Sequence, residues 1–273
     1  MCAESPLLLT PLYLWYLEPG LQGWKVFSQN EEDGALEAVF DYVGTTDKIY
    51  VEFGVEDCRE CNTRYLREKK GWNVGESLLM DGSHENPDIR LEKVIFWPDN
   101  ILQLFQRFQV KKTFDLLSVD MDSYDFFMLE TILKAGFRPR VIIVEYNANF
   151  EITEAKSILP PGDGKSWVRW DASTYQGMSL LAVQYLLNRF SYSLVYCNKV
   201  NCIGVEDSLL DSPVRIQTEF FNRGRLDQHR CDMTVRGDCW PSYSPVVSGL
   251  ERMTGARAVL TSAAEALISL QIL

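Results

Sequence analysis

Short apolar runs alternate with amphipathic helical segments through most of the chain, and this alternation already narrows the fold class. The apolar runs expected as strands are residues 48–53, 78–80, 94–96, 114–119 and 141–144, with a close pair at 192–196 and 203–205. The segments expected as helices are residues 28–43, 61–70, 101–108, 126–135 and 178–190. Strands separated by helices are typical of parallel βαβ units. We therefore predict an α/β fold built on a doubly wound sheet.

Two segments carry clear local signals. The run 141–144 (Val-Ile-Ile-Val) is β-branched throughout, which is typical of a strand buried on both faces of a parallel sheet. The helix at 28–43 is expected to begin at an N-cap, Ser28, with Glu31 three residues later as in a capping box.

Polar residues follow the expected strands at the points where those strands end. In chain order they are Glu52 and Gly54, Asp81, Asp120 and Asp122, and Glu145 and Asn147. Parallel βαβ units are right-handed, so the carboxyl ends of their strands open on one edge of the sheet, where ligands bind. Asp and Asn are also common in turns, but four occupied strand ends favour a binding site at this edge.

The charge balance restricts the ligand. The 273 residues include 27 Lys and Arg against 38 Asp and Glu, a formal net charge of -11. A negative field of this size disfavours nucleic acid and anionic membrane surfaces as partners. A small neutral or cationic ligand is compatible with it.

The loop after the first strand argues against a dinucleotide. It holds one glycine, Gly54, instead of the G-x-G-x-x-G pattern, and it carries the carboxylates Glu52, Glu56 and Asp57. These charges would repel a pyrophosphate, so NAD and FAD are not expected. A phosphate-free nucleoside with a cationic group fits better, and Asp81 stands where a carboxylate accepts hydrogen bonds from ribose hydroxyls.

Several short segments, in fixed order and spacing, carry a resemblance. They are SQNEED at 28–33, VEFGVED at 51–57, CNT at 61–63, LMDGSHENP at 79–87, DLLSVDMD at 115–122, VEYN at 144–147, YQGMSL at 175–180 and YSLVYC at 192–197. Together they resemble the FkbM-like family of S-adenosylmethionine-dependent methyltransferases. The match extends over residues 27–207.

The resemblance implies a class I methyltransferase (Rossmann-like) fold, with a mostly parallel seven-stranded sheet and helices on both of its faces. S-adenosyl-L-methionine would lie over the first two strands as the cofactor. Carried over by position, the cofactor-binding residues are Gln29, Asp33, Glu52, Gly54, Asn62, Thr63, Asp81, Gly82 and Asp120. Cys58 and Ser123 stand where the family usually has glycine.

The activity implied is O-methylation of a hydroxyl on a small molecule, a sugar or a lipid. Donor and acceptor must be aligned for an in-line displacement, and a base can remove the hydroxyl proton. The candidate catalytic bases are Asp122, Glu145 and His84. His84 lies just past the ribose-binding acid, and a turn residue beside the adenine is an equal interpretation of it.

Other functions remain open. Asp120-Met-Asp122 is a D-x-D triplet of the kind that holds manganese and a sugar nucleotide in glycosyltransferases. A second alternative is a degenerate methyltransferase fold that acts only as a binding protein. Cys58 supports this alternative because it stands in the cofactor loop where the family usually has glycine. Asp120, Asp122, Glu145 and Asn147 also offer oxygen ligands that suit a hard cation such as Mg²⁺. We favour the interpretation without a metal, in which these groups bind the cofactor amine and helix N-termini.

The chain is expected to divide into an N-terminal arm at 1–27, a methyltransferase domain at 28–209 and a C-terminal extension at 210–273. Within the domain, residues 149–175 are expected to form a lid-like insertion over the site. No basic residue precedes the apolar N-terminal run, so we predict a packed arm there and not a signal peptide. No apolar stretch is long enough to predict a membrane span.

The cysteines predict a compartment. There are seven, an odd and low number for this length, so we expect reduced thiols in a cytoplasmic protein. The alternative is a zinc site with four thiolate ligands, Cys58, Cys61, Cys197 and Cys202. It is less favoured because the spacing of the second pair fits a zinc knuckle poorly.

Overall fold

The computed structural model describes residues 24–150, 155–158, 167, 176–198 and 200–211. Most of the predicted arm, most of the insertion and nearly all of the extension lie outside these residues, and residues 24–27 are the part of the arm that is described. The helices are α2 (Glu32–Val43), α3 (Arg64–Lys69), α4 (Ile101–Arg107), α5 (Asp125–Lys134) and α6 (Leu180–Arg189), with the 3₁₀ turns η1 (Pro87–Ile89) and η2 (Asp207–Leu209). The strands are β1 (Tyr50–Phe53), β2 (Leu78–Asp81), β3 (Leu91–Lys93), β4 (Thr113–Val119), β5 (Arg138–Glu145), β6 (Tyr192–Cys197) and β7 (Asn201–Glu206).

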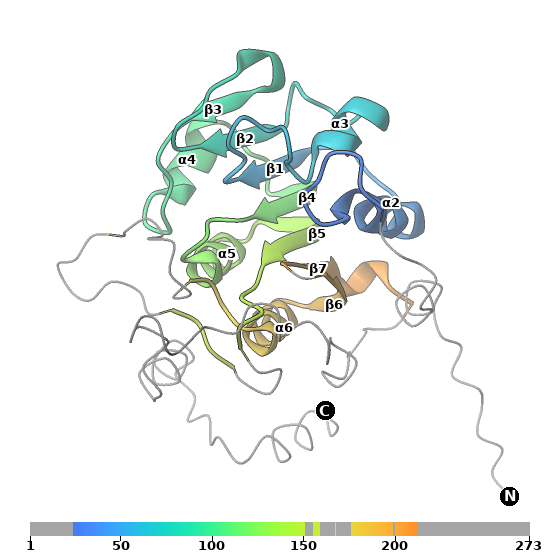
Figure 1. The fold of residues 1–273 in the computed structure, drawn as a ribbon, viewed down its shortest axis with the longest axis vertical. Coiled ribbons are helices and arrows are strands. Elements are labelled where there is room, and N and C mark those ends of the chain that lie inside the picture. Colours follow the sequence, from blue (N-terminus) through green and yellow to red (C-terminus); the bar gives the residue numbers. More distant parts are fainter. Residues whose placement is uncertain (1–23, 151–154, 159–166, 168–175, 199, 212–273) are drawn as a thin grey trace, which may run out of the picture.

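The strands form a seven-stranded sheet in the order β3-β2-β1-β4-β5-β7-β6 (Figure 1). The neighbours from β3 to β5 are parallel, whereas β7 runs antiparallel to both β5 and β6. This confirms the predicted mostly parallel, doubly wound α/β sheet. The strand order reverses between β1 and β4, which is the point where sheets of this kind bind ligands.

Helices cover both faces of the sheet (Figure 1). Alternate residues of a strand point to opposite faces, so Val51 and Phe53 pack in the core with α4, α5 and α6. Tyr50, their neighbour in β1, packs with α2 and α3 on the other face. The same alternation in the other central strands leaves them buried on both sides, as the run 141–144 predicted. Within the described part of the chain, no helix is both long and apolar enough to cross a bilayer.

The third strand was predicted at 94–96 and lies three residues earlier, at Leu91–Lys93. It pairs with β2, and the pairing stops because β2 itself ends at Asp81. The apolar residues that follow serve a different purpose: the ring of Phe96 packs 5.4 Å from that of Phe53, centroid to centroid. The predicted strand was therefore wrong in position, because its apolar residues cover the end of the sheet instead of extending it.

The first predicted helix also begins later than expected. Glu31 has a φ of 73°, in the left-handed region, and α2 starts at Glu32. The Ser28 hydroxyl still accepts a hydrogen bond from the Asp33 amide (3.1 Å). Asp33 Oδ2 in turn accepts from the amides of residues 26–28 at 2.7 to 3.1 Å. The segment before α2 is therefore a turn wrapped around the Asp33 carboxylate, and Ser28 is not an N-cap.

Asp115 anchors the segment that leads into β1. It is fully buried on β4, and its carboxylate accepts hydrogen bonds from the amides of Thr46 (2.9 Å) and Lys48 (2.7 Å) and from the Thr46 hydroxyl (3.1 Å). Arg140 Nε lies 3.1 Å from the same carboxylate. This buried group therefore joins β4 to the chain entering β1 and to β5.

Replacing Asp115 tests this anchor. Asp115→Ala leaves buried donors and the Arg140 charge without their acceptor, so we expect a loss of about 3 to 5 kcal/mol in the free energy of unfolding. Asp47→Ala is the matched control, because the ion pair of Asp47 with Lys111 is partly exposed and its loss should cost less than about 1 kcal/mol. Urea unfolding measures both. Equal losses in the two variants would contradict the assignment.

Candidate functional site

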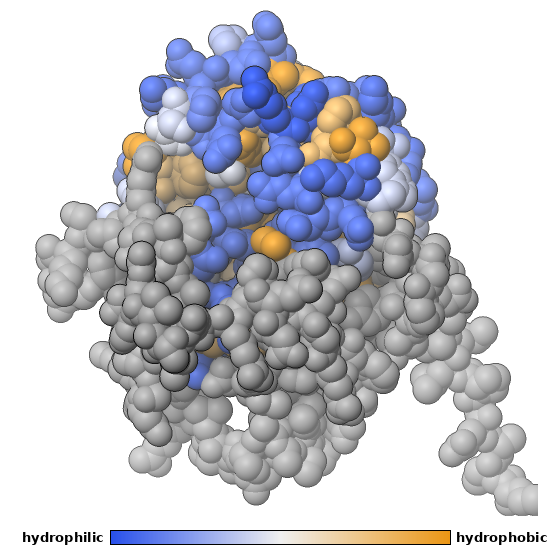
Figure 2. Space-filling view, viewed as in Figure 1, coloured by the Kyte–Doolittle hydropathy of each residue, from blue (hydrophilic) through white to orange (hydrophobic). Residues whose placement is uncertain are grey.

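A cavity of about 760 Å³ opens at the carboxyl ends of β1, β2, β4 and β5. The predicted strand-end residues that line it are Glu52, Gly54, Asp81, Asp120, Asp122 and Glu145. They come together because parallel strands end at the same edge of a sheet and the strand order reverses there. The prediction that these residues share one edge is confirmed. On the face seen in Figure 2, hydrophilic residues make up most of the described surface.

The remaining predicted residues fall into two groups. Those that also line the cavity are Gln29, Asn62 and Gly82, and those that do not are Asp33, Thr63 and His84. Asn147, predicted at the end of the fifth strand, does not line the cavity either. The second group supports the wall from behind: Thr63 hydrogen-bonds to Glu52, and the His84 ring lies against Asp81. Asp33 holds the turn that precedes α2. Their contribution to a ligand would therefore be indirect.

Glu52 ties the end of β1 to the segment before α3. Its Oε1 accepts hydrogen bonds from the Asn62 amide (2.8 Å) and the Ser118 hydroxyl (3.2 Å). Its Oε2 accepts from the Thr63 amide (3.1 Å) and hydroxyl (2.6 Å). Burial raises the pKa of Glu52, and these hydrogen bonds oppose the rise. Glu52 therefore shapes the cavity by fixing Asn62 and Thr63.

Gly54 lets the ends of β1 and β4 approach closely. Its φ is +70°, and a Cβ built on it would lie 2.0 Å from the Asp120 carbonyl oxygen. Any side chain at this position would therefore collide with backbone, which cannot move aside cheaply. The glycine brings Asp120 to the same cavity as the loop after β1.

Asp81 organises the loop after β2. Its Oδ1 accepts hydrogen bonds from the Ser83 amide and hydroxyl (both 2.7 Å) and from the His84 amide (3.0 Å). Its Oδ2 accepts from the Glu56 amide (3.0 Å), which joins the loops after β1 and β2. Burial acts to raise the pKa of Asp81, but the hydrogen bonds from Ser83 and His84 outweigh it and the pKa is lowered. Asp81 is therefore a carboxylate at neutral pH.

His84 stands apart from the other two candidate bases. Its Nδ1 lies 2.9 Å from the Ser83 hydroxyl and 3.3 Å from Asp81 Oδ1. The side chain is 47% exposed and does not line the cavity. His84 is therefore a residue of the turn after β2, and it does not lie in the cavity with Asp122 and Glu145.

Asp120, Asp122 and Glu145 form an acidic cluster in the cavity. One carboxylate oxygen from each lies within 4.8 Å of the others. Burial, followed by the neighbouring acids, raises the pKa of Asp120 and of Glu145 well above the ordinary values. Burial and then Glu56 raise the pKa of Asp122. Three carboxyl groups are therefore held where full ionisation is costly.

Asp125 holds the turn that carries this cluster. Its Oδ1 accepts a hydrogen bond from the Met121 amide (2.8 Å) and its Oδ2 from the Ser123 amide (3.1 Å). Asp122, between these two residues, adopts a left-handed φ of 54°. Burial raises the pKa of Asp125 to about 7 despite these hydrogen bonds. Sequence analysis did not single out Asp125. Its place at the start of a helix, three residues after Asp122, was the available signal, because Asp side chains at such positions accept hydrogen bonds from nearby backbone amides.

An apolar wall, of which residues 94–96 were predicted as a strand, closes another side of the cavity. It consists of Val94, Ile95, Phe96 and Trp97. The Trp97 ring packs edge-on against Tyr124 at 6.3 Å, and Tyr124 packs edge-on against Trp167 at 4.7 Å. Trp167, which belongs to the predicted insertion, also donates from Nε1 to Asp99 (2.5 Å). The cavity therefore has an acidic side and an aromatic side.

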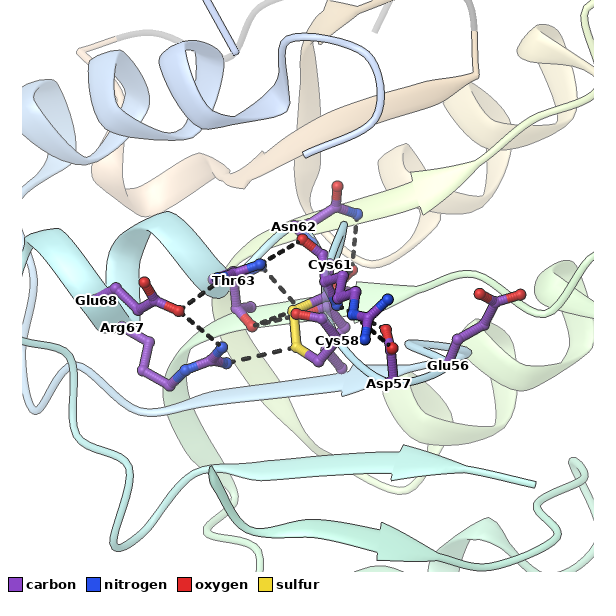
Figure 3. The surroundings of a disulfide bond; sticks show 12 residues. Glu56, Asp57, Cys58, Cys61, Asn62, Thr63, Arg67 and Glu68 are labelled. Carbon is purple, nitrogen blue, oxygen red and sulfur yellow. Dashed lines mark hydrogen bonds and ion pairs between the residues drawn. A yellow bond between two sulfur atoms is a disulfide. The ribbon is translucent and has the colours of Figure 1, made fainter. Parts of the chain in front are cut away.

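The disulfide between Cys58 and Cys61 corrects the prediction of reduced thiols (Figure 3). The two residues lie in a tight turn that brings their Cα atoms to 4.8 Å. Arg67 Nη1 lies 3.5 Å from Cys58 Sγ, and a dashed line in Figure 3 marks this contact. Cys58 has a φ of 60°, in the region that favours glycine. Cys61 lines the cavity, whereas Cys58 does not.

A second disulfide joins Cys197 and Cys202, which are directly opposed in the β6–β7 pair. The four cysteines therefore form two separate pairs, and the alternative of a four-thiolate zinc site is wrong. The expectation of a cytoplasmic protein rested in part on reduced thiols, and these two disulfides remove that part of its support. Cys2, Cys231 and Cys239 lie outside the described residues.

Gly54 offers a direct test of the close approach. In Gly54→Ala the methyl group meets the Asp120 carbonyl, so we expect a loss of at least about 2 kcal/mol beyond that of the control. The control, Gly44→Ala, shares a positive φ of +68° but has nothing within 4 Å of the new Cβ, so its loss reports a backbone penalty of about 1 to 3 kcal/mol without a steric contact. Thermal and urea unfolding measure the difference. Matching losses would rule out the proposed contact.

The buried acids predict a pH dependence of stability. The folded pKa of Asp125, about 7, lies above its ordinary value of 3.8, and Asp120 and Glu145 are shifted in the same direction. Groups with a raised folded pKa stabilise at low pH and lose that contribution as pH rises through the folded pKa. The free energy of unfolding should therefore fall by more than about 1 kcal/mol between about pH 4.5 and pH 7.5. Asp120→Asn should flatten this fall, and an unchanged slope in that variant would show that the acidic cluster is not its cause.

Comparison with known proteins identified no relative. No protein-family model matches the chain, and no curated protein matches it.

Proposed function

We propose that the protein is an S-adenosylmethionine-dependent methyltransferase of the FkbM-like type that methylates a hydroxyl group. The observation that carries the proposal is the cavity itself, because acidic side chains dominate its charge. Among the described lining residues the acids are Glu52, Glu56, Asp57, Glu60, Asp81, Asp120, Asp122 and Glu145, against the single cation Arg59. Arg59 Nε is already paired with Asp57, at 2.9 Å.

This charge selects among nucleosides. A pyrophosphate in the loop after β1 would be repelled by Glu56 and Asp57, whereas a sulfonium and an ammonium group would be attracted. Asp81 is ionised and retains acceptor capacity beside its loop hydrogen bonds, so it suits ribose hydroxyls. S-adenosylmethionine has all three features: a ribose, a positive charge and no phosphate.

The sheet supports the same proposal. The order β3-β2-β1-β4-β5-β7-β6 with only β7 reversed is the arrangement expected of a class I methyltransferase. In such a sheet the cofactor lies at the ends of β1 and β2, where Gly54 and Asp81 line the cavity. Fold alone does not specify a reaction, so the strand order supplements the charge of the cavity and does not replace it.

The chemistry divides the cavity into two parts. The sulfur–methyl bond breaks as the acceptor oxygen–methyl bond forms, and the hydroxyl proton passes to a base. Asp122 and Glu145 line the cavity. Their pKa values are raised, so their carboxylates are stronger bases than carboxylates with ordinary pKa values. The aromatic side, with Phe96 and Trp97, would position the acceptor, and alignment supplies much of the rate enhancement.

Cofactor binding tests the proposal. S-adenosylhomocysteine should bind in calorimetry, and Asp81→Asn should weaken it about tenfold or more, because a charged hydrogen-bond acceptor is lost. The matched control is Asp88→Asn, at an exposed acid outside the cavity, which should bind like the parent protein. Asparagine keeps one acceptor for the Ser83 loop, so the variant should fold.

The alternative functions give different results. A D-x-D glycosyltransferase would be stabilised by a UDP-sugar with Mn²⁺ and not by S-adenosylhomocysteine. A degenerate binding protein would respond to neither. Either result, or equal affinity in Asp81→Asn and the parent, would refute the methyltransferase proposal.

A further inference from the structure

We propose that Asp120, Asp122 and Glu145 together bind one hard divalent cation, such as Mg²⁺ or Mn²⁺, in the cavity. Such an ion goes beyond the methyltransferase function proposed above, and only its role toward an acceptor rests on that function. The three carboxylates would be its protein ligands.

The distances suit a single ion. One oxygen from each carboxylate lies within 4.8 Å of the other two. Oxygen ligands bind Mg²⁺ at about 2.1 Å and Ca²⁺ at about 2.3 to 2.6 Å, so two ligands on opposite sides of one ion lie roughly 4 to 5 Å apart. The cluster is therefore already near the spacing that one ion requires.

A buried oxygen without a partner points to a missing ligand. Glu145 is only 6% exposed, and its Oε2 has no hydrogen-bond partner although the residue lines the cavity. A buried carboxylate oxygen left unpaired is costly. It is explained if the oxygen has a partner that enters from the cavity.

No cation of the described chain fills that role. Among the described residues, no lysine or arginine forms an ion pair with the cluster. The neighbouring acid Asp125 is not an alternative ligand, because both of its oxygens accept backbone hydrogen bonds. Asn147, which the sequence offered as a fourth ligand, uses its Oδ1 for the Asn149 amide (3.0 Å) and side chain (2.8 Å). The candidate set thus narrows to three carboxylates.

The position of the cluster gives the ion a use. Three carboxylates leave coordination positions open to the cavity, where water or an acceptor hydroxyl can bind. A metal-bound hydroxyl would lose its proton more readily than a free one, and the proton would pass to water in the cavity. Asp122 and Glu145 would then act through the ion as its ligands, and an acceptor with an accessible hydroxyl beside the aromatic wall would be the preferred substrate.

Mn²⁺ binding tests the site without any assay of activity. The full chain, freed of metal, is titrated with Mn²⁺, and free Mn²⁺ is counted by electron paramagnetic resonance. We expect one ion per chain in the parent protein and at least tenfold weaker binding in Glu145→Gln and in Asp122→Asn. The matched controls, Glu85→Gln and Asp88→Asn, carry the same chemical changes at exposed acids and should bind like the parent. Removing a buried charge should not unfold the variants, and thermal unfolding checks this.

S-adenosylhomocysteine affinity, measured on the same proteins, separates the metal site from the proposed function. Mn²⁺ binding that depends on Glu145 and Asp122 supports the metal site, whether or not the nucleoside binds. Absence of Mn²⁺ binding at millimolar concentration overturns it, as does equal binding by Glu145→Gln and Glu85→Gln. Loss of nucleoside binding in Glu145→Gln without any Mn²⁺ binding in the parent would assign the cluster to the cofactor amine instead.

Discussion

The close approach of Gly54 to the Asp120 carbonyl is the contact on which the site depends. A side chain at Gly54 would have to occupy the space of a backbone oxygen 2.0 Å away, so the two strand ends meet only because this residue has none. The contact lies at the point where the strand order reverses, and it brings the acids of β4 to the loops after β1 and β2. Asp81 extends the same junction by accepting the Glu56 amide. The cavity is thus a product of backbone packing first and of side-chain chemistry second.

The fold keeps several carboxylates buried at this junction, and they differ in how they are satisfied. Glu52 and Asp125 are surrounded by hydrogen-bond donors from their own chain and hold loops in place. Asp120 and Glu145 share a side-chain hydrogen bond, Glu145 Oε2 has no hydrogen-bond partner among the described residues, and burial beside other acids raises the pKa of Asp120, Asp122 and Glu145. Strongly shifted acids in a cleft are typical of functional sites, because stability alone would not favour them. Acids that lie close together in the sequence, such as Asp122 and Asp125, therefore have different roles. Those that accept backbone hydrogen bonds are structural, and the others are candidates for binding a ligand.

Sequence reasoning predicted the sheet and the gathering of strand-end residues, because both follow from periodicity and from the geometry of parallel strands. It did not predict which polar side chains bind neighbouring segments of the chain instead of lining the cavity. Asp33, Thr63 and His84 have suitable chemistry, but their side chains are used by neighbouring segments, and this depends on contacts that no pattern encodes. The residues 94–96 were assigned to a strand because they are apolar, whereas the length of β2 decides where pairing stops. The two disulfides escaped prediction for a related reason, since an odd number of cysteines says nothing of which pairs are adjacent in space.

The reversed strand β7 has a consequence for how the chain is made. It lies between β5 and β6 although it is the last of the three to be synthesised. Until residues 201–206 leave the ribosome, the β-branched edge of β5 has no neighbour on that side. Unpaired strand edges invite association with other chains, so this part of the sheet is most vulnerable just before β7 is inserted.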